Sequence, residues 1–158
     1  MQIDFTEDQV RFFHNLGDGT FEDQASDAGL TDTGQGRGVV CFDADRDGDL
    51  DILITNNGPE AIVYYRNDSI NNNHYLGITL AGNGSNPFGI GAHITVTTDA
   101  GIQVRELGGS NNFTSHNPLE VHFGLGAATS ADISVRWPDA QVTEVSGVEA
   151  DQLVLIGR

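Results

Sequence analysis

The sequence predicts an all-β protein, and three observations support this. Glycine is frequent, at 20 of 158 residues, and it clusters with Asn and Asp between the apolar runs. Those runs are short and rich in β-branched and aromatic residues, which is typical of strands. Within them apolar and polar residues alternate, so that Ile133, Val135 and Trp137 are expected to share one face of a strand.

The first half is predicted to be an antiparallel β-meander. The turn segments 15–19 and 56–59 contain Asn, Asp and Gly, which tolerate the positive φ of tight reversals. The small, polar segment 25–36 is expected to be a helical turn or a plain loop. The candidate strands are residues 10–14, 38–42, 51–55 and 61–66, with a possible further strand at 20–22.

A polar break at residues 67–73 has nothing to bury and predicts a junction between two units, residues 1–70 and 71–158. The second unit is predicted to be a β-sandwich or a small barrel, because it holds seven candidate strands. These strands are residues 74–80, 91–98, 102–107, 119–123, 131–137, 142–148 and 152–156.

The charge balance is strongly acidic, with 7 Lys plus Arg against 23 Asp plus Glu and a net charge of −16. This argues against nucleic acid or anionic lipid as partners. The chain has no Lys, which indicates either a salt-rich or marine source or a secreted calcium protein. No apolar run approaches the roughly 18 residues of a membrane span. The single cysteine, Cys41, lies in an apolar run, so we expect a buried thiol and no internal disulfide.

The densest chemical feature is the segment 43–51, which carries five aspartates at alternate positions. Oxygen ligands at this density suit Ca²⁺, which takes about six to eight of them, better than Mg²⁺ or a softer metal. From the spacing, Asp43, Asp45 and Asp47 are expected to offer their side chains. Asp49 would offer its backbone carbonyl, and Asp51 a closing carboxylate.

The flanking residues exclude an EF-hand. Such a loop needs a Glu at its twelfth position, about where Ile54 stands, and helices on both sides, where this chain has strand-like runs. The segment is therefore predicted to be a calcium loop between two strands, with Gly48 at its sharp bend. The alternative is a solvated acidic turn without metal, in which the repulsion among five carboxylates has no evident compensation.

Several motifs carry a resemblance to known families. Residues 12–21, 36–40 and 62–67, together with the aspartate segment, resemble an FG-GAP or VCBS repeat. The second half resembles an ASPIC/UnbV domain, which follows such repeats in other chains. That resemblance rests on residues 73–76, 85–86, 89–92, 122–126 and the run Val-Arg-Trp-Pro-Asp at 135–139. Ala140 stands where the Trp-Pro motif usually continues into glycine.

The resemblance implies a fold and a context. FG-GAP repeats form blades of calcium-loaded β-propellers, and this chain holds material for about one blade. The expected architecture is therefore a single propeller-blade-like meander followed by an ASPIC/UnbV sandwich or small barrel, at the C-terminal end of a longer secreted or cell-surface protein. The exposed edges of a lone blade could also mediate self-association.

The favoured function is a calcium-stabilised, non-catalytic binding or adhesion module whose partner is an extracellular protein or glycan. The sequence has no GxSxG elbow, and its five histidines form no HExxH motif. One alternative is a carbohydrate-binding module of a secreted polysaccharide-active enzyme, using loops 83–88 and 108–117. Another is the accessory end of a propeller-based enzyme whose chemistry lies in other blades.

Overall fold

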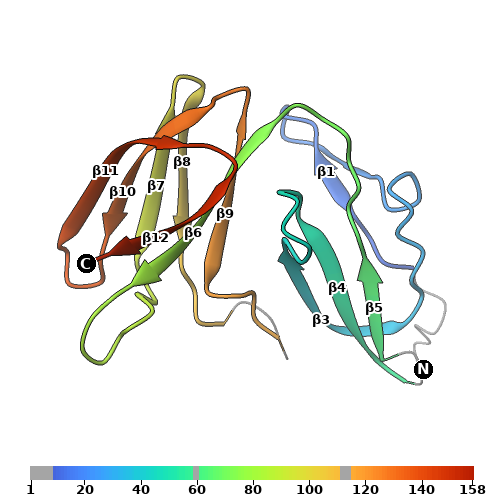
Figure 1. Cartoon of the computed structure of the whole chain (residues 1–158). Coiled ribbons are helices and arrows are strands. Elements are labelled where there is room, and N and C mark those ends of the chain that lie inside the picture. The colour runs from blue at the N-terminus through green and yellow to red at the C-terminus, as the bar shows by residue number, and fades with distance from the viewer. Residues whose placement is uncertain (1–8, 59–60, 111–114) are drawn as a thin grey trace.

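The computed structural model describes residues 9–58, 61–110 and 115–158, which contain β-strands and no helix (Figure 1). The all-β prediction is therefore confirmed. Figure 1 shows two groups of strands side by side, called here the N-terminal sheets (β1 to β5) and the sandwich (β6 to β12). Pro59 of the expected turn at 56–59 and residues 111–114 of loop 108–117 lie outside the described residues.

The N-terminal sheets are a hairpin and a three-stranded antiparallel meander. The hairpin begins at Phe13 rather than at residue 10, and its turn is held where Asn15 Oδ1 accepts a hydrogen bond from the Gly17 N–H at 2.9 Å. Segment 25–36 starts as a single turn and ends in a strand. The hairpin strands are β1 (Phe13–Asn15) and β2 (Phe21–Asp23), and the meander strands are β3 (Gln35–Phe42), β4 (Asp51–Asn57) and β5 (Ile62–Tyr65).

The expectation of a buried thiol is wrong, because Cys41 is exposed. Along β3, Val40 and Phe42 are half-buried, whereas Val39 and Cys41 project from the opposite, more open face. A continuous apolar run is buried on both faces of a strand only where other elements cover both faces of the sheet. On β3 the face that carries Val40 and Phe42 is the more covered of the two. Partial desolvation nevertheless raises the pKa of the Cys41 thiol.

The second group of strands is a sandwich, and it is not closed into a barrel. A four-stranded sheet in the order β11-β10-β7-β8 faces a three-stranded sheet in the order β12-β6-β9. All seven expected strands are present, and β12 pairs in parallel with β6. The strands are β6 (His74–Ala81), β7 (His93–Thr98), β8 (Gly101–Glu106), β9 (Glu120–Gly126), β10 (Ser130–Arg136), β11 (Val142–Glu149) and β12 (Gln152–Gly157).

The hydrophobic core lies between these two sheets. Its members alternate along the strands, and the face predicted from Ile133, Val135 and Trp137 is buried, at 2%, 0% and 1% exposure. From the opposite sheet Phe123 is fully buried as well. The Trp137 Nε1–H donates to Thr143 Oγ1 at 2.9 Å, so the indole is buried with its polar atom satisfied.

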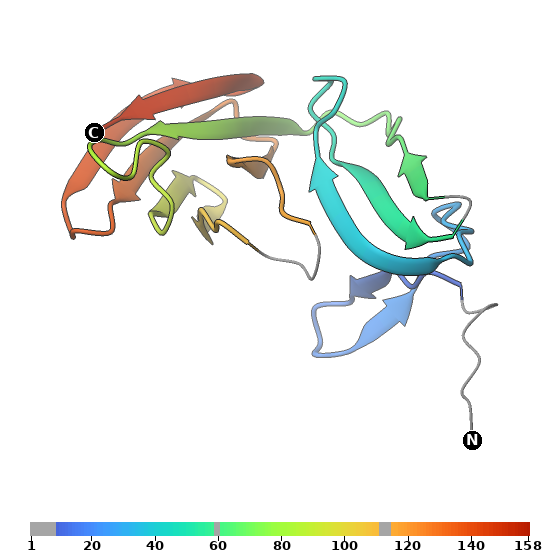
Figure 2. The ribbon, with the colours of Figure 1, turned by 90° about the horizontal axis from the view of Figure 1, so that it is seen from below.

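The polar segment 66–73 runs from the N-terminal sheets to the sandwich and forms no strand. Local hydrogen bonds shape it: Asn67 Oδ1 accepts from the Ser69 N–H at 3.1 Å, and Asn71 Oδ1 from the Asn73 N–H at 2.8 Å. Among the described strands, no backbone pairing joins the two groups of strands. Figure 2 shows these two groups from below. A boundary near residue 70 stays a prediction.

Candidate metal centre

The aspartate-rich segment is the loop between β3 and β4. The two strands pair antiparallel with Phe42 opposite Asp51, so residues 43–50 form the connection. Gly48 has a φ of 100°, the left-handed bend expected from the sequence. Arg46 also has a positive φ, of 66°, which is uncommon for a residue with a side chain.

Three carboxylates converge inside this loop. One oxygen each from Asp43, Asp45 and Asp47 lie within 4.8 Å of one another. Asp43 is only 6% exposed, and its Oδ2 accepts a hydrogen bond from the Gly48 N–H at 3.1 Å. Its Oδ1 is buried and has no hydrogen-bond partner in the part of the chain that the structure describes. A buried, unpaired carboxylate oxygen beside two further carboxylates is energetically costly unless a cation compensates it.

Asp51 has a different environment from the other aspartates. It is fully buried, and its oxygens accept hydrogen bonds from the Asn67 N–H at 2.8 Å, the Tyr64 hydroxyl at 2.9 Å and the Ala44 N–H at 3.0 Å. These bonds brace the base of the loop against β5 and the segment after it. Its part as a metal ligand stays a prediction, as does that of Asp49, whose N–H donates to Asp47 Oδ1 at 3.0 Å.

The electrostatics of the loop follow from this crowding. Desolvation, and then the charges of Asp47 and Asp51, raise the pKa of the Asp45 carboxyl above its usual value. Arg66 lies 3.8 Å from Asp45 and offsets part of the repulsion. Desolvation and the hydrogen bond to Asp51 raise the pKa of Tyr64 to about 12, which keeps its hydroxyl a donor.

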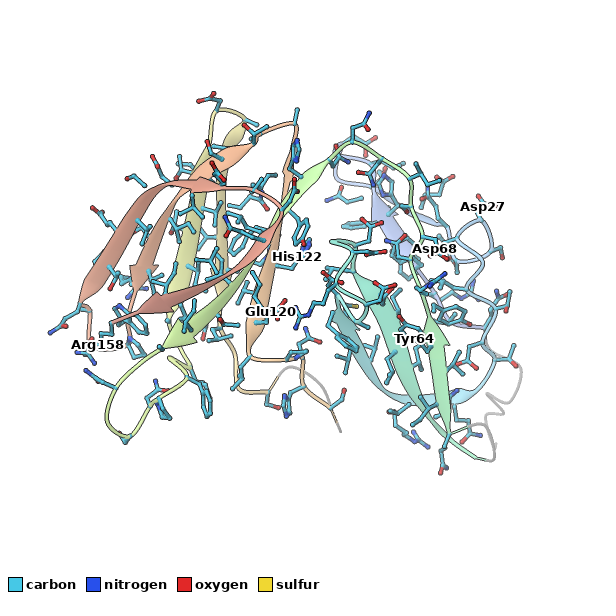
Figure 3. The ribbon with its side chains drawn as sticks, in the orientation of Figure 1. Asp27, Tyr64, Asp68, Glu120, His122 and Arg158 are labelled. Atoms are coloured by element: carbon cyan, nitrogen blue, oxygen red, sulfur yellow. The ribbon has the colours of Figure 1, made fainter. Side chains whose placement is uncertain are left out.

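The outer side of the loop contacts the sandwich, a contact that was not predicted from the sequence. Arg46 Nη1 donates to both carboxylate oxygens of Glu120, at 2.8 and 2.9 Å. His122 Nε2 lies 2.9 Å from the Gly48 carbonyl oxygen. Figure 3 labels Glu120 and His122 on the side of the sandwich that faces the N-terminal sheets. Both alternate with the core residues Val121 and Phe123 along β9, the one available signal that they face outward.

Comparison with known proteins agrees with this architecture. Residues 82–158 match the family model described as ASPIC and UnbV, and residues 4–54 match the FG-GAP-like repeat. The chain carries an FG-GAP-like repeat followed by an ASPIC/UnbV domain. The resemblance predicted from the motifs is therefore confirmed. The FG-GAP-like match includes the whole aspartate loop and β4 up to Ile54.

Curated relatives match this chain over a short segment of 52 to 57 residues. Cartilage acidic protein 1 of Homo sapiens is 54% identical over 52 residues, which is 32% of this chain and 8% of that protein. The Mus musculus protein is 52% identical over 52 residues, and that of Xenopus tropicalis 49% over 57 residues, covering 8% and 9% of those proteins. The chain thus matches less than a tenth of the length of these relatives.

The family descriptions and the names of the relatives denote no enzyme. They fit an extracellular module. Among the described residues there is no helix long and apolar enough to cross a bilayer.

Proposed function

We propose that this chain is an extracellular calcium-binding module without catalytic activity, and that it is part of a longer secreted protein. The observation that carries the proposal is the buried Asp43 Oδ1 atom, which lacks a hydrogen-bond partner among the described residues and lies beside the carboxylates of Asp45 and Asp47. A divalent cation there would offset most of the repulsion among the three carboxylates and bind the unpaired oxygen.

The donor set favours Ca²⁺ over other ions. The converging groups are carboxylates, which are hard ligands, and they lie on an irregular loop rather than in a rigid octahedral cage. Asp43, Asp45 and Asp47 would hold the ion with their side chains, with the Asp49 carbonyl, Asp51 and water completing the set. The ion would act structurally, by ordering the loop and the two strands that it joins.

The test is the melting temperature with calcium and with a chelator. For a dissociation constant near 10⁻⁴ M, a hundredfold excess of free Ca²⁺ would stabilise the fold by about 2.7 kcal/mol, or roughly 5–10 °C in a domain of this size. Asp45→Ala should abolish this difference, because it removes a ligand of the cluster. Asp99→Ala, which removes the same charge from the turn between β7 and β8, should leave it intact. A wild-type melt that is the same in EDTA and in calcium would refute the proposal.

The partner is proposed to be an extracellular protein or glycan. Exposed apolar side chains, including Phe13, Phe21 and Ile62, lie on the N-terminal sheets and offer contact surface. The outer edge of β5, with which no described strand pairs, could instead pair with another copy of the chain, which light scattering across a concentration series would detect. Binding on a glycan array would favour a carbohydrate-binding module over an adhesion module.

A further inference from the structure

The tip of the aspartate loop docks on the outer face of the three-stranded sheet of the sandwich. Arg46 Nη1 donates to both carboxylate oxygens of Glu120, and His122 Nε2 lies 2.9 Å from the Gly48 carbonyl oxygen. Tyr75 stacks on His122, with ring centroids 5.6 Å apart and planes 7° apart, and supports that ring. A Cβ atom added at Gly48 would overlap the Tyr75 ring, so the backbone of the loop lies directly against this platform.

Consecutive residues of the loop therefore serve two sides. Asp43, Asp45 and Asp47 direct their carboxylates to one another, whereas the intervening Arg46 and the following Gly48 contact the sandwich. The positive φ values of Arg46 and Gly48, 66° and 100°, are part of this arrangement. The convergence of the carboxylates and the contacts with the sandwich therefore belong to the same loop conformation.

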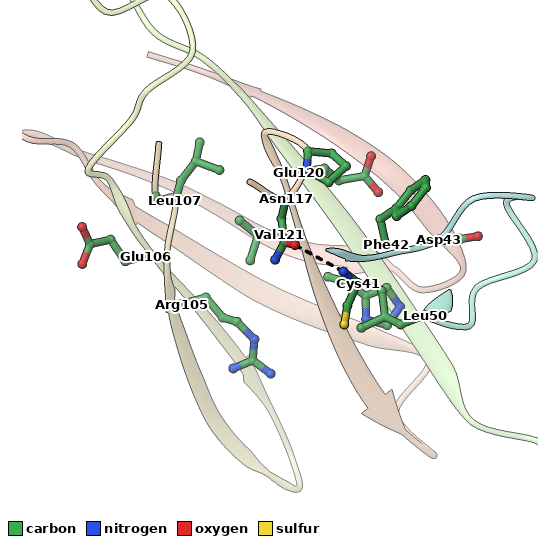
Figure 4. Close-up of a pocket in the computed structure, with 13 residues that line it drawn as sticks. Cys41, Phe42, Asp43, Leu50, Arg105, Glu106, Leu107, Asn117, Glu120 and Val121 are labelled. Atoms are coloured by element: carbon green, nitrogen blue, oxygen red, sulfur yellow. Dashed lines mark hydrogen bonds between the residues drawn. The ribbon is translucent and has the colours of Figure 1, made fainter. Parts of the chain in front are cut away.

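A second set of contacts joins β3 to the segment that precedes β9, and there a Cβ added at Gly38 would lie 2.6 Å from Ser115 Oγ. The Cys41 N–H donates to Asn117 Oδ1 at 3.2 Å, and the Ser115 hydroxyl donates to the Val39 carbonyl at 3.3 Å. A cavity of about 290 Å³ lies beside these contacts, lined from both groups by residues such as Leu50 and Arg105 (Figure 4). The connecting segment 66–73 is polar and contains no regular structure.

We propose that the aspartate loop is a cation-dependent latch between the FG-GAP-like unit and the sandwich. This inference rests on the calcium binding proposed above and adds a role to it. Calcium holds Asp43, Asp45 and Asp47 together and thereby keeps Arg46 and Gly48 in the shape that fits Glu120, His122 and Tyr75. Without the ion the carboxylates separate, the tip leaves the platform, and the two units reorient about segment 66–73.

Linkage makes the latch measurable. If calcium favours the docked arrangement, docking must strengthen calcium binding by the same factor. We expect Glu120→Gln and Arg46→Asn each to raise the calcium dissociation constant about fivefold or more, in line with typical coupling between sites. Asparagine is chosen at Arg46 because it tolerates a positive φ. Glu144→Gln on β11 removes the same charge far from the loop and should change the constant less than twofold.

The direction in which Arg46→Asn changes the calcium affinity distinguishes docking from simple electrostatics. Removing a positive charge beside three carboxylates should tighten calcium binding if charge alone acts, whereas loss of the latch should weaken it. Tighter or unchanged binding by Arg46→Asn would overturn the latch, even with calcium binding intact.

The orientation of the units gives a second, independent measurement. Residual dipolar couplings should fit one alignment tensor for both units in calcium and two different tensors after chelation. Glu120→Gln in saturating calcium should resemble the chelated wild type, and Glu144→Gln the calcium-bound one. A wild type that binds no calcium in calorimetry contradicts the proposed function itself. A wild type that binds calcium but keeps one tensor after chelation contradicts only the latch.

Discussion

Asp45 lies in the aspartate loop and Asp51 at its base, but their surroundings shift their carboxyl pKa values in opposite directions. Burial of Asp51 alone would raise its pKa, yet hydrogen bonds from Asn67, Ala44 and Tyr64 outweigh burial and hold the pKa below its usual value. At Asp45, burial and the charges of Asp47 and Asp51 outweigh the charge of Arg66 and the backbone hydrogen bond from Asp47, so that the pKa of its carboxyl is raised. Asp51 therefore stabilises the folded state as an anion, whereas folding disfavours the anionic form of Asp45.

This difference predicts distinct effects of removing each charge without calcium. Asp51→Asn should lower the free energy of unfolding by about 1–3 kcal/mol. The NH₂ group of asparagine would replace a carboxylate oxygen and leave at least one buried donor without an acceptor. Asp45→Asn should leave the stability unchanged or raise it slightly, because it relieves repulsion. Urea unfolding in chelator measures both, and equal losses would contradict the two roles.

Acid should remove the contribution of Asp51. Because the pKa of its carboxyl is lowered on folding, the stabilisation is fully present above the unfolded value of about 3.9 and is lost as the pH falls through the lower folded pKa. In chelator, the stability difference between wild type and Asp51→Asn should be constant above about pH 5 and shrink below about pH 4. A difference that grows on acidification would mean that the anion is not the stabilising form.

At the scale of the element, the turn between β10 and β11 shows how one position departs from the usual motif. The Trp137 N–H donates to the Gln141 carbonyl at 2.8 Å, and the Ala140 N–H donates to the Trp137 carbonyl at 2.9 Å. Ala140 has a φ of 67°, in the region where glycine is favoured. The turn therefore keeps a conformation that suits glycine although alanine occupies it.

Ala140→Gly should stabilise the protein by roughly 0.5–1 kcal/mol, since relief of left-handed strain exceeds the added entropy of the unfolded chain. Ala100→Gly, in the turn between β7 and β8 where φ is not positive, is the matched control and should be neutral or destabilising. Thermal or urea unfolding measures both. A loss of stability in Ala140→Gly equal to that in the control would show that the turn holds no such strain.

At the scale of the whole molecule, the two groups of strands bury very different amounts of apolar surface. The sandwich has one continuous core between its sheets. In the described part of residues 9–66 the buried hydrophobic residues are Ala25, Leu30 and Ile54. The N-terminal sheets should therefore depend on the proposed calcium ion, and the sandwich should not.

Hydrogen exchange tests this division. Chelation should speed the exchange of amides in β3 and β4 at least tenfold, because the loop that joins them loses its ion, and should leave β6 and β10 unchanged. Ile94→Ala, which truncates a fully buried residue of the sandwich at a cost of about 2–5 kcal/mol, should do the reverse. Equal acceleration in both groups after chelation would contradict the division.

Much of the local structure could be predicted from the sequence alone. Alternation at Ile133, Val135 and Trp137 identified a buried face, and the motifs identified both families, because strand period and turn chemistry are properties of neighbouring residues. The spacing of the aspartates likewise identified the loop in which Asp43, Asp45 and Asp47 converge. What that loop binds stays a prediction.

Only the tertiary structure decided which distant elements meet. The parallel pairing of β12 with β6, the exposure of Cys41 and the docking of Arg46 on Glu120 depend on residues far apart in the chain. The alternation of apolar and polar residues along a single strand does not indicate which element covers its face or pairs with its edge. The sequence by itself thus determined the elements and a candidate ligand set, and the packing of the two groups of strands decided that this loop also contacts the sandwich.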